Sequence, residues 1–296
     1  MSPADVLEDL PITDWSGPFS PALQARAVSA LEAGRVIFCP RLPFEVTPDE
    51  TGFLNPTVGD DTRKNVSLDP ATGVLGATAL DSDDAARLAG MMQRFSDQTV
   101  SLLHGLFPGY ASTLERARTS FRPTEIAGRD YSPRHDDRRL HVDAFPSRPL
   151  GGRRILRVFS NIADDGSARA WRVGEPFAEF APKFLPRAKA PAPGAAWLMQ
   201  RLGLTKGRRT PYDHLMLSLH DQAKLDATYQ QTAPKVGVEI PAGATWFCFT
   251  DQVLHAALSG HCALEQTFHL PVEAMARPEQ SPLRVLEALA GRRLAA

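Results

Sequence analysis

Residues 154–161 read Arg154-Ile155-Leu156-Arg157-Val158-Phe159-Ser160-Asn161, and the prediction of the fold starts from this stretch. Apolar residues occupy both sets of alternating positions, which indicates a strand of a sheet that is buried on both faces. The alternation places Arg157 with Ile155, Phe159 and Asn161 on one face, and Arg154 with Leu156 and Val158 on the other. A lone arginine on a buried face needs an anion, either a bound carboxylate or an acidic side chain of the same chain.

Similar short apolar segments, broken by Pro and Gly, fill the chain after residue 110. They predict strands at residues 119–126, 140–144, 155–162, 215–219, 236–240, 245–250 and 263–270. Helix signals predict helices at residues 21–34, 81–106, 222–229 and 282–294, and an apolar run predicts a strand at 36–39. We therefore expect a mostly β fold with flanking α-helices, a sandwich or jelly roll. Residues 1–110 are predicted to be a helical and irregular extension packed on a core of residues 111–296.

The composition of the 296-residue chain excludes several classes of protein. The sequence has no apolar run long enough to span a membrane, and its acidic N-terminus does not resemble a secretory signal. Three cysteines without C-x-x-C spacing argue against a disulfide framework or a structural zinc site. The net charge of −1 gives no sign of a nucleic-acid-binding protein. We expect a cytoplasmic protein that does not bind nucleic acid.

The near-neutral charge hides an uneven distribution along the sequence. Residues 116–209 carry 20 basic and 9 acidic residues, while the segments before and after them are acidic. Arginine binds carboxylates and phosphates in a bidentate manner, so this middle third is predicted to bind anions or to be a solvated face. Within it, residues 183–209 interleave basic and apolar side chains, which is typical of an anionic membrane surface contact or of a flexible basic loop.

Candidate metal ligands lie just before the 154–161 segment. His141 and Asp143 are two residues apart in a segment predicted to be extended, so both side chains point to one face. His255, after the apolar run 246–249, is the best candidate for a third ligand. Two His and one carboxylate on one side of an ion are typical of non-haem Fe(II) oxygenases, in which the anion facing Arg157 would be 2-oxoglutarate. His135 with Asp137, and the pair His214 and His220, remain alternative ligands.

Several blocks in this order resemble the Kdo hydroxylase family. They are residues 139–149, 153–162, 171–177, 217–221, 255–257 and 265–271, with a looser match over residues 56–76. The resemblance covers about residues 119–272. It implies a double-stranded β-helix core and the Fe(II)- and 2-oxoglutarate-dependent hydroxylation, with O2, of C3 of 3-deoxy-D-manno-octulosonic acid (Kdo) to give Ko. The implied partner is a Kdo-containing lipid A precursor or lipopolysaccharide at the cytoplasmic face of the inner membrane.

The resemblance also implies roles for six residues. The metal ligands would be His141, Asp143 and His255, and the 2-oxoglutarate contacts would be Arg157, Arg122 and Trp171. One feature departs from the wider superfamily, because the strand predicted after His255 has no Arg or Lys to bind 2-oxoglutarate. We expect Arg157 to replace that residue and Gln266 to hydrogen-bond near the site. A hydroxylase of a protein or small metabolite, and a non-catalytic cupin-like binding module, remain alternatives.

Overall fold

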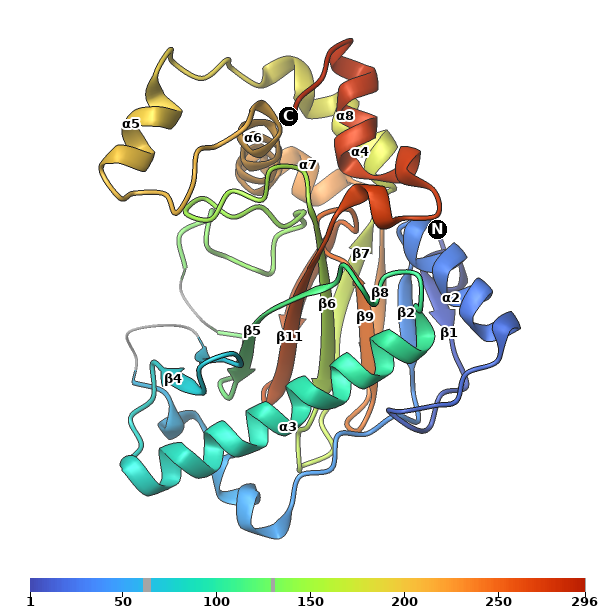
Figure 1. Cartoon of the computed structure of the whole chain (residues 1–296), viewed down its shortest axis with the longest axis vertical. Helices are drawn as coiled ribbons and strands as arrows, with labels where there is room; N and C mark the ends of the chain where they lie inside the picture. The colour runs from blue at the N-terminus through green and yellow to red at the C-terminus, as the bar shows by residue number, and fades with distance from the viewer. Residues whose placement is uncertain (61–64, 129–130, 296) are drawn as a thin grey trace.

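The computed structural model describes residues 1–60, 65–128 and 131–295, and it is mostly β with helices outside (Figure 1). Its described strands form an eight-stranded sheet in the order β1-β2-β9-β6-β11-β5-β3-β4 and a three-stranded sheet in the order β10-β7-β8. The strands are β1 Leu7–Asp9, β2 Val36–Cys39, β3 Val66–Asp69, β4 Val74–Gly76, β5 Glu115–Arg122, β6 Arg154–Asn161, β7 Arg169–Gly174, β8 Lys235–Ile240, β9 Thr245–Phe249, β10 His255–Ser259 and β11 Ala263–Leu270. The predicted fold class, mostly β with flanking α-helices and a jelly-roll core, is confirmed.

Strand β6 is central to the larger sheet, and its predicted alternation is confirmed. Leu156 and Val158 join the core on the sheet's outer face. Phe159 lies on the opposite face, where its ring centroid is 5.1 Å from that of Trp246 on β9 and 5.2 Å from that of Trp171 on β7. Aromatic side chains therefore fill the space between the two sheets, which is the arrangement of a sandwich.

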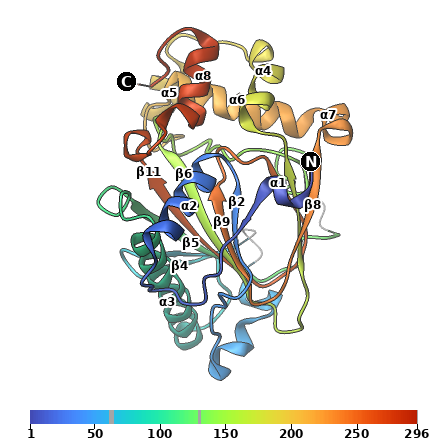
Figure 2. The ribbon, with the colours of Figure 1, turned by 90° about the vertical axis from the view of Figure 1, so that its right-hand side faces the viewer.

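The helices cover the outside of the sheets. They are α1 Pro3–Val6, α2 Pro21–Glu32, α3 Ser82–Leu106, α4 Phe177–Phe184, α5 Ala195–Arg201, α6 Pro211–Leu225, α7 Ala227–Thr232 and α8 Pro282–Ala290. The long helix α3 crosses the outer face of the larger sheet (Figure 1), while α4, α6, α7 and α8 gather beyond the ends of the strands (Figure 2). No described helix has the length and apolar character needed to cross a membrane.

The segment predicted as a strand at residues 215–219 is helical instead. It lies inside α6, which begins at a capping box of Thr210 and Asp213 with Pro211 in the first turn. Its buried apolar positions follow helical spacing and are Tyr212, Met216, Leu219 and Ala223. A window of five residues was too short to distinguish the two-residue period of a strand from the 3.6-residue period of a helix. The predicted helix 222–229 is wrong in its bounds too, because α6 runs through Leu225 and Asp226 then caps α7.

Residues 140–144 are extended but do not form a strand. Their described sheet pairing is a single bridge, between His141 and His255. Conversely, β7 and β10 were not predicted, because two arginines interrupt the apolar pattern of β7 and β10 is short and contains two alanines, which have low β-propensity. The first 110 residues contribute β1 to β4 to the larger sheet, in addition to helices α1 to α3. That residues 1–110 form an extension packed on a core of residues 111–296 stays a prediction.

Candidate metal centre

His141 and His255 are held together by their backbones. The N–H of His141 donates to the carbonyl of His255 over 3.1 Å, and the N–H of His255 donates to the carbonyl of His141 over 2.9 Å. Their ring centroids lie 4.5 Å apart. The loop before β6 and the start of β10 thus bring two histidines, 114 positions apart in the sequence, to one point.

The orientation of both rings is set by backbone carbonyls. His141 Nδ1 lies 2.8 Å from the carbonyl of Arg139, and His255 Nδ1 lies 2.9 Å from the carbonyl of Val253. A carbonyl oxygen only accepts hydrogen bonds, so each Nδ1 carries the proton and each Nε2 keeps its lone pair. Metal-binding histidines are commonly oriented in this way by a hydrogen bond at the other ring nitrogen.

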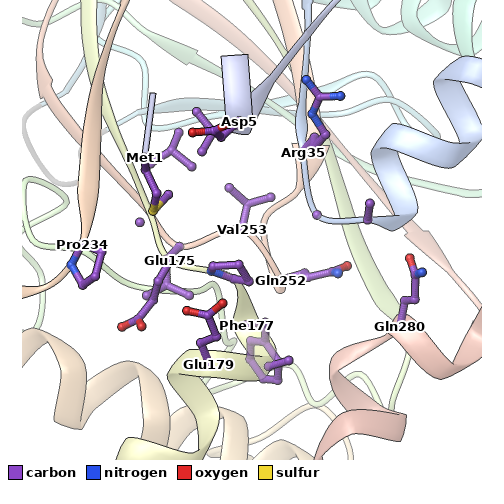
Figure 3. A pocket seen from close by; sticks show the side chains of 18 of the residues that line it. Met1, Asp5, Arg35, Glu175, Phe177, Glu179, Pro234, Gln252, Val253 and Gln280 are labelled. Carbon is purple, nitrogen blue, oxygen red and sulfur yellow. The ribbon is translucent and has the colours of Figure 1, made fainter. Parts of the chain in front are cut away.

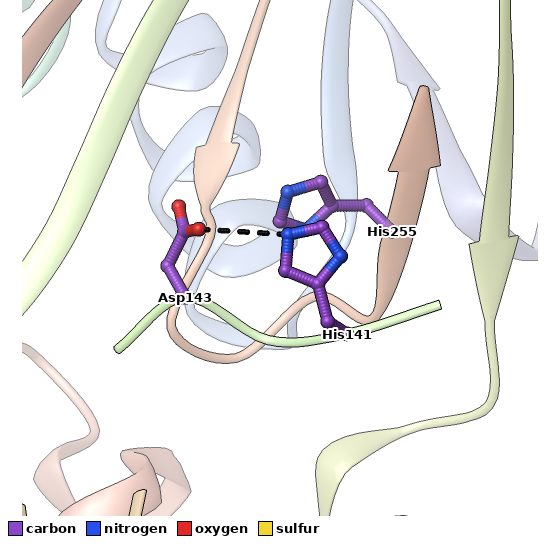
Figure 4. Close-up of side chains that lie close together, drawn as sticks. All are labelled: His141, Asp143 and His255. Carbon is purple, nitrogen blue, oxygen red and sulfur yellow. Dashed lines mark ion pairs between the residues drawn. The ribbon is translucent and has the colours of Figure 1, made fainter. Parts of the chain in front are cut away.

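Asp143 completes the cluster from the same loop as His141 (Figure 4). Its backbone N–H donates to the carbonyl of Thr250 over 2.8 Å. Its Oδ1 lies 3.8 Å from His141 Nε2, and the ligand atoms of the three residues lie within 4.8 Å of one another. Two imidazoles and one carboxylate can therefore reach one ion from the same side.

Electrostatics keeps the three side chains in metal-binding protonation states. Burial lowers the pKa of both imidazoles, and the neighbouring His255 lowers that of His141 further, so both rings are neutral at pH 7. Burial alone would raise the pKa of the Asp143 carboxyl, but the Arg157 guanidinium holds it below its ordinary value. A neutral His pair with an ionised carboxylate is the form that binds a divalent metal.

A cavity of about 210 Å³ opens beside the cluster. All six residues predicted for the site line it, namely His141, Asp143, His255, Arg157, Arg122 and Trp171. The Trp171 ring is stacked on that of His255, with centroids 5.3 Å apart and an interplanar angle of 21°. Asp137, Phe159, Arg169 and Ala257 line the cavity as well. The structure thus brings the six predicted residues to one place.

The two arginines of the prediction are paired with acids of the chain in this structure. Arg157 Nε lies 3.3 Å from Asp143 Oδ2, and Arg157 Nη1 lies 3.3 Å from Glu265 Oε1. Arg122 on β5 forms an ion pair with the other oxygen of Glu265 on β11. The Glu265 side chain, 4 % exposed, therefore connects both arginines.

Several buried polar atoms around the cavity have no hydrogen-bond partner within the described parts of the chain. They are the donors Arg122 Nε and Trp171 Nε1, together with Asp143 Oδ2 and Arg157 Nε, which form an ion pair with each other but lack hydrogen-bond geometry. Unsatisfied buried polar atoms are costly, and they indicate that the site is shaped for bound groups. A cation beside Asp143 and a carboxylate beside the donors would satisfy them. The residues present therefore fit a divalent metal with 2-oxoglutarate.

The sequence analysis did not predict Glu265 or Arg169 at the site, and it named Asp137 only as an alternative ligand together with His135. The alternation of strand 263–270 contained a signal for Glu265, because this residue pairs with Phe159 in the sheet and so faces the cavity with it. The prediction that Gln266 hydrogen-bonds near the site is wrong. Its side chain points to the opposite face of the sheet, where its Oε1 accepts a hydrogen bond from the Thr119 hydroxyl over 2.6 Å. Arg169 lies on β7, which had not been predicted as a strand.

The alternative histidine ligands lie outside the cluster. His135 is hydrogen-bonded to Ser132, and His214 to the carbonyl of Lys189. His220 is closer, with its ring edge-to-face with His141 at a centroid distance of 5.4 Å, but its Nδ1 is bound to Asp221. None of the three joins the group of ligand atoms found among the described residues.

A second, larger cavity of about 590 Å³ lies near the N-terminus (Figure 3). None of the six predicted residues lines it. Its buried carboxylate, Glu175, is already satisfied by Lys183 and by the hydroxyl of Tyr229. The chemistry expected from the sequence therefore belongs to the smaller cavity.

A family model and several solved structures point to one family. A family model described as 3-deoxy-D-manno-oct-2-ulosonic acid (Kdo) hydroxylase matches residues 14–293. Three crystal structures of the Kdo hydroxylase KdoO, a non-haem Fe(II) alpha-ketoglutarate-dependent dioxygenase, share 48% identity over 98% of this chain and 97% of theirs. Their TM-scores are 0.95 with alpha-ketoglutarate and Fe(III), 0.96 with cobalt(II), and 0.94 with succinate and Fe(III). No curated protein sequence matches the chain. By its family match and by its likeness to KdoO over nearly its full length, the chain belongs to the Kdo hydroxylase family.

Proposed function

We propose that this chain is an Fe(II)- and 2-oxoglutarate-dependent dioxygenase that hydroxylates C3 of Kdo in a lipid A precursor or lipopolysaccharide to give Ko. The observation that carries the proposal is the cluster of His141, Asp143 and His255 beside a cavity that Arg157 and Arg122 also line. Related structures of KdoO contain iron with alpha-ketoglutarate or succinate, the substrate and product of such a reaction.

The metal ligands are His141, Asp143 and His255. They would hold the ion beside the cavity, as two His and one carboxylate do in other facial-triad sites. Bound Fe(II) supplies the coupling of O2 reduction to the oxidative decarboxylation of 2-oxoglutarate and to hydroxylation of the substrate. The carbonyls of Arg139 and Val253 hold the imidazoles in the required orientation.

The 2-oxoglutarate contacts are Arg157, Arg122 and Trp171. Glu265 forms ion pairs with both arginines. The carboxylate of 2-oxoglutarate would therefore compete with Glu265 for them or bind them alongside it. The Trp171 indole N–H is a free buried donor on the same cavity wall, as judged from the described residues. The rings of Phe159 and Trp171 form an apolar part of the cavity wall.

The decisive experiment is turnover with purified protein, Fe(II), 2-oxoglutarate and a Kdo-bearing lipid A precursor. We expect succinate release together with an acceptor heavier by one oxygen atom, located at C3 by tandem mass spectrometry. Succinate release with proteins or small metabolites, but not with Kdo acceptors, would favour another hydroxylase. Metal binding without succinate release from any acceptor would favour the non-catalytic cupin-like alternative.

We also propose that α5 and the turn after it contact the anionic surface of the inner membrane from the cytoplasm. Trp197, Leu198, Leu202 and Leu204 are large apolar side chains exposed by 57%, 49%, 63% and 63%. Arg201, Lys206 and Arg208 lie exposed beside them in the sequence. Helix α5 has no buried residue and projects from the body of the molecule (Figure 1). Such a combination suits the interface of an anionic bilayer.

Co-sedimentation with vesicles tests this contact. The variant Trp197→Ser with Leu202→Ser should lose binding to vesicles that contain phosphatidylglycerol, while vesicles of phosphatidylcholine alone should bind neither protein. The matched control is Val74→Ser with Leu225→Ser, which removes two apolar side chains exposed by 63% and 47% elsewhere. Equal binding of both double variants would reject the membrane contact.

A further inference from the structure

Two further cavities continue outward from the metal centre. The inner one, of about 490 Å³, is lined by Arg157, which also lines the metal cavity. The outer one, of about 480 Å³, shares Arg118, Arg148 and His269 with the inner one. The three cavities therefore lie in a row, and the two outer ones form a groove that ends at the turn containing Lys206.

Strand β5 runs along this groove. Arg118, Ser120 and Arg122 alternate with the buried residues Thr119 and Phe121, so the first three face the groove side of the strand. Ser120 is opposite Glu265 in the sheet, which fixes the direction of that face. Four residues of a strand span roughly 13 Å, so Arg118 lies about that far from Arg122, beyond the space of one sugar ring.

Three cations of the groove have no acidic partner among the described residues. They are Arg118, Arg148 and Lys206, in contrast to Arg116, Arg153 and Arg157, which line the groove but form ion pairs. Two acids line the outer cavity, Asp69 and Glu115, and Glu115 is paired with Arg153. The groove therefore keeps an excess of positive charge, which suits an anionic ligand.

The backbone around these cations is anchored. The N–H of Lys206 donates to the carbonyl of Ser147 over 2.8 Å, which joins the turn after α5 to the loop that carries Arg148. Thr205, next to Lys206, is 4 % exposed, and its hydroxyl donates to the carbonyl of Gly207 over 2.7 Å. Arg118 lies within strand β5, opposite the register shift between Gln266 and Phe268 of β11. The charges are thus presented from three ordered segments that meet at one groove.

We propose that Arg118, Arg148 and Lys206 form a second anion subsite, which binds a phosphate or carboxylate group of the acceptor outside the reacting sugar. This inference rests on the proposed function, because it takes the acceptor to be a Kdo-bearing glycolipid. Two sources of the anion fit the same chemistry, a phosphate of lipid A and the carboxylate of a neighbouring Kdo. The subsite makes the enzyme select the assembled glycolipid over free Kdo.

The test compares the double variant Arg118→Gln with Arg148→Gln against the matched control Arg41→Gln with Arg172→Gln. The control removes two exposed arginines that do not line the groove. We expect the groove variant to raise KM for the lipid-linked acceptor by about 10-fold or more, as expected for two lost charge-assisted hydrogen bonds. Its KM for 2-oxoglutarate and its kcat should equal those of the control.

Acceptors that lack one anionic group show which group the subsite binds, a lipid A phosphate or the carboxylate of a second Kdo. If a lipid A phosphate is bound, the KM penalty of the variant disappears on a dephosphorylated acceptor; if a second Kdo carboxylate is bound, it disappears on an acceptor with a single Kdo. An unchanged KM, or an equal penalty on every acceptor including free Kdo, would overturn the subsite while wild-type turnover upholds the proposed function. Absence of wild-type turnover on all Kdo acceptors would instead reject the proposed function itself.

Discussion

The backbone N–H of His141 donates to the carbonyl of His255, and the N–H of His255 donates back to the carbonyl of His141, over 3.1 and 2.9 Å. This reciprocal pair is the described sheet contact of residues 140–144, and it holds the two imidazoles at a centroid distance of 4.5 Å. Because backbone bonds and not side-chain contacts set the distance, a substitution at either position removes a ligand without removing the pairing.

Loss of one ligand is therefore expected to abolish metal binding while the fold is kept. His141→Ala should weaken Fe(II) binding by more than the roughly 10–100-fold typical of residues that only orient a ligand. Succinate release should fall to background. Titration of the apoprotein with Co(II), followed by absorption, measures the affinity, and circular dichroism checks the fold. His135→Ala is the control, and an equal effect of both variants would reject His141 as a ligand.

Arg157 is expected to bind the co-substrate. Truncating one partner of a buried charge pair costs about 2 kcal/mol or more, so Arg157→Gln should raise KM for 2-oxoglutarate by roughly 30-fold or more. Arg157→Lys should recover only part of this loss, because an ammonium cannot form a bidentate pair. Steady-state succinate release at varied 2-oxoglutarate measures both. A KM within twofold of wild type in Arg157→Gln would assign the carboxylate to another residue.

Gly260 is predicted to support the site through Arg169. Its φ is +111°, and an added Cβ would lie 2.9 Å from Arg169 Cγ and 3.0 Å from its Cα. Gly166 also has a positive φ, of +77°, but a Cβ added there would meet no atom within 4 Å. Gly166→Ala should cost about 1–2 kcal/mol of unfolding free energy from backbone strain. Gly260→Ala should cost more and should also raise KM for 2-oxoglutarate, whereas equal losses in urea denaturation would contradict the contact.

His269 is predicted to weaken the fold at mildly acid pH. Burial, aided by the Arg153 guanidinium, lowers the pKa of His269 from 6.5 to about 4. As pH falls below 6.5 the unfolded chain takes up this proton first, so the folded state loses relative stability until about pH 4. The loss is at most about 3 kcal/mol for this group. Urea denaturation at several pH values should show a smaller loss in His269→Asn than in wild type, and parallel pH profiles would refute the assignment.

Much of the fold could be predicted because its strands carry their pattern locally. The 154–161 segment alternates Arg157 and Phe159 toward the site with Leu156 and Val158 toward the outer core, as the structure confirms. The prediction of a strand at residues 215–219 was wrong because these five apolar-rich residues fit a helix equally well. The helix cap at Thr210, which would have indicated a helix, lies outside that segment. A local hydrophobic pattern therefore distinguishes a helix from a strand only when the segment considered includes the residues that begin and end the element.

The features of the site also divide into those that the sequence determines and those that only the tertiary structure determines. The sequence by itself determined the candidate ligands His141, Asp143 and His255, but residue type and spacing left His135, Asp137, His214 and His220 as alternatives. Only the tertiary structure decided that His255 pairs with His141 across 114 positions, that Glu265 bridges Arg122 and Arg157, and that Arg118 and Arg148 meet in one groove. The physical reason is that these contacts depend on strand register and on how the loops close. Both bring together residues that are far apart in the sequence, and the local sequence around one residue does not specify its distant partner.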